Sequence, residues 1–173
     1  MRTLFATTLA AALALGFAAQ AQAPAPAAAP AQHRDAREQA PPGLIGLWKA
    51  DMALSTYGGA KPRSALRSFS YTADGKILVT FMTVGANGAY STGHWAAQPD
   101  GTDGIEYHSA AGSTPYNVVR LKKVDDKNLD LEVVRFGKVT DRYHYTLSDD
   151  LKTLTYTYPN NKIVYRKWEA MDW

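Results

Sequence analysis

The sequence predicts an all-β domain in which an antiparallel up-and-down meander closes into a barrel of about 8–10 strands. From residue 44 to residue 168, short runs of β-forming residues alternate with turn signals at spacings of 8 to 12 residues, which is typical of a sandwich or a barrel. The runs follow one another without a long crossover. A meander of this many strands exposes two edges unless it closes, so we expect closure.

The expected strands are separated by recognisable turns. Residues 73–76 contain Asp-Gly and residues 85–88 contain Asn-Gly, the composition of tight hairpin turns. A short helical turn is expected over 52–57, and 109–115 form a loop of small residues. The expected strands are 44–50, 65–72, 77–84, 89–98, 105–108, 116–124, 129–136, 139–147, 153–158 and 163–168.

The residues before the barrel predict export. Residues 1–21 resemble a secretory signal peptide, with Arg2 before an apolar run and a small-x-small cleavage pattern at residues 19–21. Residues 22–42, rich in Ala and Pro, predict a disordered tether, which leaves 43–173 as one domain. The chain has no cysteine for a disulfide or a lipoprotein anchor. We expect a periplasmic or secreted protein with no membrane segment after signal cleavage.

The charge pattern argues against a nucleic-acid partner. The formal net charge is +3, and the basic residues are scattered among acidic ones. A nucleic-acid surface requires basic residues clustered on one face. The oligomeric state is left open.

Alternation along the strands predicts which side chains face inward. Three strands give inward sets that combine aliphatic residues with tyrosines: Leu129, Leu131, Val133 and Arg135; Val139, Asp141, Tyr143, Tyr145 and Leu147; Leu154, Tyr156 and Tyr158. Polar heads among apolar walls suit a ligand cavity. The same tyrosines also suit a filled core, so the sequence leaves both interpretations open.

Several stretches, taken in order, carry a family resemblance. They are residues 46–49 (Gly-Leu-Trp-Lys), 53–57, 71–75, 119–125 and 147–155. In this order the chain resembles an uncharacterised group of exported bacterial lipocalin-like proteins within the calycin barrels. The resemblance implies that Trp48 plugs one end of the barrel under a basic side chain from near the last strand, for which Arg166 is the candidate. It also implies a small hydrophobic or aromatic ligand at the other end.

Two sets of residues are candidates for a site. His94, Tyr107, His108 and Arg120 lie on sequential strands and would serve acid/base catalysis if the protein is an enzyme. The alternative is that these side chains face solvent and Arg120 pairs with a surface carboxylate. The candidate ligand-binding residues are Trp95, Arg135, Tyr143, Tyr145 and Tyr156.

Arg135 has two interpretations of its own. It continues an inward face, where a charge is costly unless it is paired. It either binds an anionic group of a ligand or pairs with Asp141 on the neighbouring strand.

The histidines lack metal-ligand spacing, so we expect no metal, and no cofactor motif occurs. The function predicted is an exported lipocalin-like protein that binds a small apolar or aromatic ligand in the barrel. The alternatives are a periplasmic enzyme of isomerase or lyase type acting on a molecule in the same cavity, and a structural protein of the cell envelope with a filled barrel.

Overall fold

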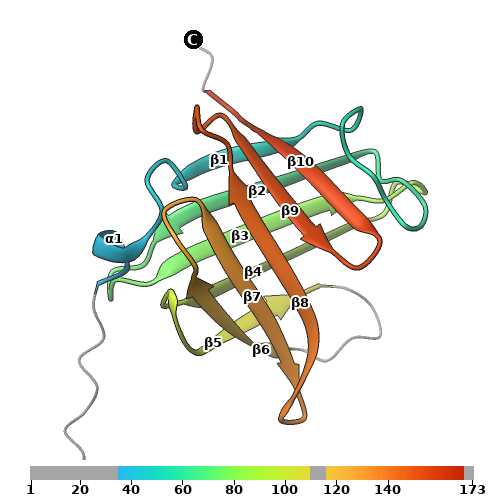
Figure 1. The fold of residues 1–173 in the computed structure, drawn as a ribbon. Coiled ribbons are helices and arrows are strands. Elements are labelled where there is room, and N and C mark those ends of the chain that lie inside the picture. The colour runs from blue at the N-terminus through green and yellow to red at the C-terminus, as the bar shows by residue number, and fades with distance from the viewer. Residues whose placement is uncertain (1–34, 110–115, 170–173) are drawn as a thin grey trace, which may run out of the picture. The chain divides into compact units, whose positions relative to one another are not determined.

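A computed structural model describes residues 35–109 and 116–169, all within one compact unit, Gln32–Trp173. Ten antiparallel strands form a closed barrel in which neighbours in sequence are neighbours in space (Figure 1). The predicted closed up-and-down meander is therefore confirmed. The strands are β1 (Gly46–Ala50), β2 (Ser64–Tyr71), β3 (Ile77–Val84), β4 (Tyr90–Ala97), β5 (Asp100–His108), β6 (Tyr116–Lys123), β7 (Asn128–Arg135), β8 (Lys138–Leu147), β9 (Thr153–Tyr158) and β10 (Asn161–Lys167).

The barrel closes through β1, which pairs with both β2 and β10. Trp48 is opposite Arg67 on one side and Lys167 on the other. Each strand thus has two hydrogen-bonded neighbours, which removes the free edges of an open sheet.

The interior follows the expected alternation on β7, β8 and β9. Leu129, Leu131 and Val133 are buried, whereas Asp130 is exposed. The pairing of β7 with β8 shifts between Val133 and Val134, and this irregularity lets both valines be buried.

Trp48 lies at one end of the core and is fully buried. Its indole nitrogen donates to the carbonyl of Leu44 at 2.9 Å. The ammonium of Lys167 lies 5.3 Å from the centre of the indole and donates to the carbonyl of Gly43 at 2.8 Å. These contacts fix the segment before β1 to the end of β10.

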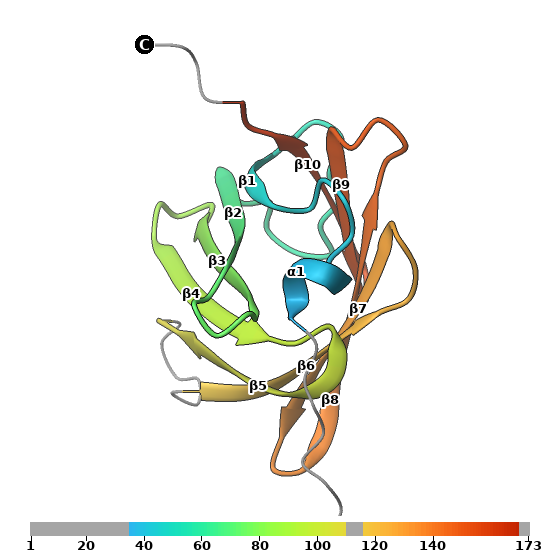
Figure 2. The ribbon, with the colours of Figure 1, turned by 90° about the vertical axis from the view of Figure 1, so that its left-hand side faces the viewer.

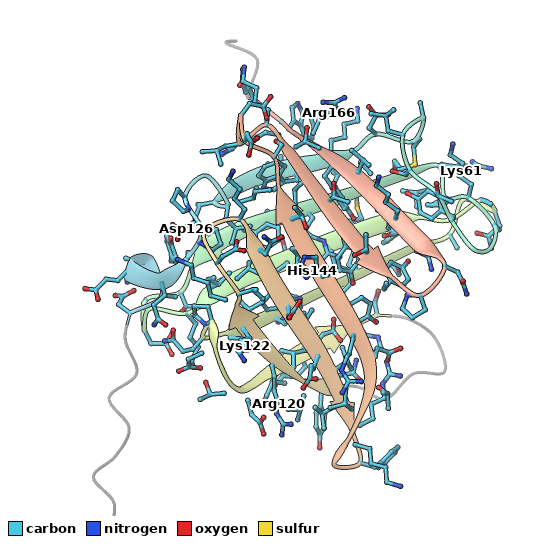
Figure 3. All side chains as sticks on the ribbon, in the orientation of Figure 1. Lys61, Arg120, Lys122, Asp126, His144 and Arg166 are labelled. Atoms are coloured by element: carbon cyan, nitrogen blue, oxygen red, sulfur yellow. The ribbon has the colours of Figure 1, made fainter. Side chains whose placement is uncertain are left out.

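The prediction that Arg166 covers Trp48 is wrong. Arg166 points outward from β10 (Figure 3) and lies 3.5 Å from the carboxylate of Asp51. Successive residues of a strand face opposite sides of a sheet, so Lys167 is the inward cation and Arg166 is not.

A single turn of helix, α1 (Ala36–Gln39), lies across one end of the barrel (Figure 2). Ala36 is fully buried in the core, and its amide donates to the carbonyl of Gly75 at 2.8 Å. Asp35 caps the turn by accepting from the amide of Arg37. The packed part of the chain thus begins before residue 43. The expected signal peptide and residues 22–34 of the expected tether lie outside the described residues.

Candidate functional site

The interior of the barrel contains a cavity of about 180 Å³. Side chains from seven strands line it, and most of them are aromatic or aliphatic. The lining residues are Arg67, Phe81, Trp95, Glu106, Leu131, Val133, Tyr143 and Tyr156. Arg67 and Glu106 are the guanidinium and the carboxylate in this lining.

Arg67 occupies an inward position at the middle of β2, between buried Ala65 and Phe69. It is 7% exposed. Its guanidinium donates a hydrogen bond to the hydroxyl of Tyr145. Four aromatic rings surround the guanidinium carbon, at these distances to the ring centres: Tyr156 4.5 Å, Phe81 5.4 Å, Tyr145 5.5 Å and Tyr165 5.9 Å.

The charge of Arg67 is held by aromatic faces and a phenol. None of the ion pairs among the described residues includes Arg67, and its buried Nε has no hydrogen-bond partner there. Burial lowers the pKa of Arg67, but the surrounding tyrosines, Tyr145 first, raise it by more, so the guanidinium stays charged. Each cation–π contact contributes about 2 kcal/mol when desolvated, which offsets part of the several kcal/mol that an ion loses on burial.

Four tyrosines from β8 and β9 form a stack beside Arg67. The ring centres of Tyr145 and Tyr156 are 4.7 Å apart, those of Tyr143 and Tyr156 5.3 Å, and those of Tyr156 and Tyr158 5.2 Å. Burial raises the pKa of Tyr143 to about 12 and also raises the pKa values of Tyr145 and Tyr156. The stack is therefore neutral at physiological pH.

A chain of polar contacts adjoins the cavity. The Asn117 amide nitrogen donates to Glu106 Oε2 at 2.6 Å, and Arg135 Nε donates to the Asn117 amide oxygen at 2.9 Å. Arg135 also lies 3.3 Å from the carboxylate of Asp141. The pairing of Arg135 with Asp141, one of its two predicted interpretations, is therefore present.

The residues predicted to bind ligand cluster here. Trp95, Tyr143 and Tyr156 line the cavity, and Tyr145 holds the guanidinium beside it. Arg135 lies next to the cavity, engaged by Asn117 and Asp141.

Sequence reasoning missed Arg67, Glu106 and Asn117. Only a partial signal for Arg67 existed: it shares its phase with Ala65 and Phe69, but Leu66 in the other phase leaves the inward face of β2 undecided by sequence. The signal for Glu106 was misleading, because Ile105 and Tyr107 share the apolar phase of the strand expected over 105–108 but are exposed, whereas Glu106 lines the cavity.

Of the four residues predicted for catalysis, His94, Tyr107 and His108 border one hollow, and Arg120 lies apart from them. His94 and Tyr107 are opposite each other on the outer face, with ring centres 5.4 Å apart. His108 follows Tyr107 and so faces the other side of the sheet. Arg120 points outward (Figure 3) and pairs with Asp103 at 2.6 Å. Asp103 precedes Tyr107 by four residues, so the two lie roughly 13 Å apart along β5.

A larger hollow, about 610 Å³, lies outside the barrel over β1 to β5. Its outward-facing walls are Leu47, Leu66, Ser68, Thr80, Met82, Thr92, His94, Tyr107 and Ser109. It is larger than the interior cavity but more open to solvent, and the buried Arg67 borders both. The interior cavity is the more enclosed of the two and adds Glu106 and the buried Tyr156 to Arg67, so we take it as the candidate site.

Three comparisons with known proteins were made, and none returned a match: no family model, no curated protein and no solved structure matches the chain. In the part of the chain that the structure describes, no helix is long and apolar enough to cross a membrane. Within the same residues, no group of three or more His, Cys, Asp or Glu side chains is arranged to hold a metal ion.

Proposed function

We propose that this protein binds a small aromatic or apolar molecule inside the barrel, as an exported protein of lipocalin-like type. The observation that carries the proposal is the interior cavity of about 180 Å³ with its aromatic lining. An apolar cavity of about 150 Å³ can hold benzene, so this one has room for a single ring with small substituents. Ordinary drug-sized ligands occupy pockets of about 300 Å³ or more, so larger molecules do not fit.

The aromatic walls suit such a ring. Phe81, Tyr156 and Trp95 present ring faces and edges from three different strands. Offset-stacked and edge-to-face contacts between rings add about 0.5–1.5 kcal/mol each beyond the burial of area. The buried Trp95 also supplies a fluorescence signal from within the site.

The proposal is tested by titrating the purified protein with neutral single-ring probes such as phenol and toluene. Binding is followed by ligand-observed NMR and by quenching of tryptophan fluorescence. Wild-type protein is expected to bind at least one probe, and Trp95→Phe is expected to remove the fluorescence response while leaving the NMR signal.

A matched pair of variants locates the binding. Val133 lines the cavity, whereas Val118 faces outward from the adjacent strand β6. Val133→Phe fills the cavity and should weaken probe binding at least tenfold, at an overpacking cost of about 1–3 kcal/mol in stability. Val118→Phe should leave binding unchanged. Equal binding by both variants, or no probe bound by the wild type, would count against the proposal.

Export is part of the proposal and is tested separately. It is supported by the apolar run and the cleavage pattern within residues 1–21. Expression of the full chain in a Gram-negative host, followed by cell fractionation and N-terminal sequencing, should give a processed protein in the periplasm or medium. An unprocessed chain in the cytoplasm would contradict it.

A further inference from the structure

Arg67 is a buried cation in the cavity lining, and its charge indicates the charge of a ligand that would bind there. Its guanidinium lines the cavity, is 93% buried by side-chain packing, and has an Nε–H without a partner among the described residues. The aromatic rings satisfy the faces of the guanidinium. The hydroxyl of Tyr145 accepts from one terminal N–H group, whereas the Nε–H has no acceptor among the described residues. The N–H groups along one edge of a guanidinium match the two oxygens of a carboxylate.

Glu106 defines a second polar position on the cavity wall. It accepts a hydrogen bond from the Asn117 amide at 2.6 Å. The nearby Arg135 is engaged by Asp141 and Asn117. The lining therefore combines one cation and one carboxylate with apolar walls, a charge pattern that is complementary to a ligand with an acceptor and a donor.

We propose that the cavity binds a small single-ring aromatic carboxylate that carries a hydroxyl or amino group on the opposite side of the ring. The carboxylate meets the edge of Arg67, the ring lies against Phe81 and Tyr156, and the hydroxyl or amino group donates to Glu106. This inference rests on the proposed function and adds the chemical class of the ligand to it.

The test compares para-hydroxybenzoate with its neutral isostere para-hydroxybenzamide, by calorimetry on the purified full-length protein. The carboxylate should bind at least tenfold more tightly, because a charge-assisted pair with a guanidinium is stronger than a neutral hydrogen bond. The two-ring naphthoate should not bind, since the cavity is too small for it.

Two variants assign the discrimination to Arg67. Arg67→Met removes the charge and keeps an apolar side chain, so it should bind the acid and the amide with similar affinity. Arg67→Lys keeps the charge without the planar fork and should retain only part of the preference. Arg142→Met removes an arginine from the outer face of β8, where its side chain is 74% exposed, and should leave the preference intact.

The outcomes separate this inference from the proposed function. If the wild type binds acid and amide equally, or if Arg67→Met keeps the preference for the acid, the inference is overturned while the cavity remains a binding site. If neither compound nor the neutral probes phenol and toluene bind, the proposed function itself fails. Loss of acid preference in Arg67→Met, with neutral-probe binding retained, supports the inference even if that variant is less stable.

Discussion

Arg67 on β2 donates a hydrogen bond to the hydroxyl of Tyr145 on β8, although the two residues are 78 positions apart in the chain. Both side chains are buried, and the ring of Tyr145 also packs edge-on against Phe69 with ring centres 5.8 Å apart. The contact joins opposite parts of the barrel wall through its interior. It also supplies the hydrogen-bond acceptor that a buried guanidinium needs.

Removing that acceptor should destabilise the barrel. Tyr145→Phe leaves the ring in place and deprives the guanidinium of its partner, so we expect a loss of about 1–3 kcal/mol in the free energy of unfolding, measured by urea denaturation. Tyr156→Phe is the control, because the hydroxyl of Tyr156 makes no hydrogen bond to Arg67. Combining Tyr145→Phe with Arg67→Met should give a smaller loss than the sum of the single variants, because no charge is left unsatisfied. Strict additivity would contradict the role given to this contact.

The alternation of β7 and β9 made their inward faces predictable from sequence, because aliphatic and polar residues there fall in separate phases. On β2 the two phases are mixed: Arg67 shares one with Phe69, and Leu66 shares the other with Ser68. The sequence alone therefore does not decide which phase faces the core. The inward phase of β2 is decided by the burial of the residues that pair with it on β1 and β3.

Strand register explains the remaining differences between the predicted and the observed positions of side chains. A shift of one residue moves a side chain to the other face of a sheet. Arg166 and Lys167 are adjacent cations, and only the pairing of β1 with β10 shows which one reaches Trp48. His94 and His108 fall on opposite faces for the same reason, since His94 is paired with Tyr107. Turns locate strands in the sequence, but they do not fix this pairing.

Lys167 should contribute more to stability than its neighbour Arg166. Lys167→Met removes the hydrogen bond to Gly43 and the charge over Trp48, and is expected to cost about 1 kcal/mol. Arg166→Met removes an exposed side chain and should change the free energy of unfolding by less than about 0.5 kcal/mol. Thermal and urea denaturation of both variants check this. The reverse order would restore Arg166 as the important cation.

Gly93 is required because the ring of Phe81, its partner on β3, lies against it. A Cβ at residue 93 would lie 2.3 Å from the Phe81 ring and 2.7 Å from the backbone oxygen of Tyr107. Gly93→Ala should therefore displace Phe81 and cost about 1–3 kcal/mol in stability. Because Phe81 lines the cavity, probe binding should weaken as well. Gly59→Ala is the control, since nothing lies within 4 Å of its added Cβ, and similar effects of both substitutions would contradict this explanation.

The turn between β7 and β8 can be improved. Phe136 is 92% exposed with φ +51°, and Gly137 follows with φ +73°. Both angles match a type I′ turn, which favours Asn-Gly. Phe136→Asn should raise the free energy of unfolding by about 1 kcal/mol, because Asn adopts the left-handed conformation more readily. Phe136→Leu keeps the unfavourable conformation and should bring no such gain. Equal stability of the two variants in denaturation experiments would contradict this explanation.

The buried tyrosines should make the barrel sensitive to alkaline pH. Burial raises the pKa of Tyr143 to about 12, and the pKa values of Tyr145 and Tyr156 are raised as well, above the value of about 10 expected in the unfolded chain. Between about pH 10 and pH 12 the unfolded chain releases these protons and the folded chain keeps them. The free energy of unfolding should therefore be nearly constant from about pH 7 to 9 and fall as the pH rises further.

Urea denaturation at a series of pH values, with tyrosinate absorbance as a second signal, measures this fall. Tyr143→Phe removes one of the shifted groups and should make the fall shallower between about pH 10 and pH 12. Tyr90 lies on the surface, 72% exposed, and Tyr90→Phe is the matched control that should leave the slope unchanged. Equal slopes for wild type and Tyr143→Phe would mean that Tyr143 ionises as readily in the folded barrel as in the unfolded chain.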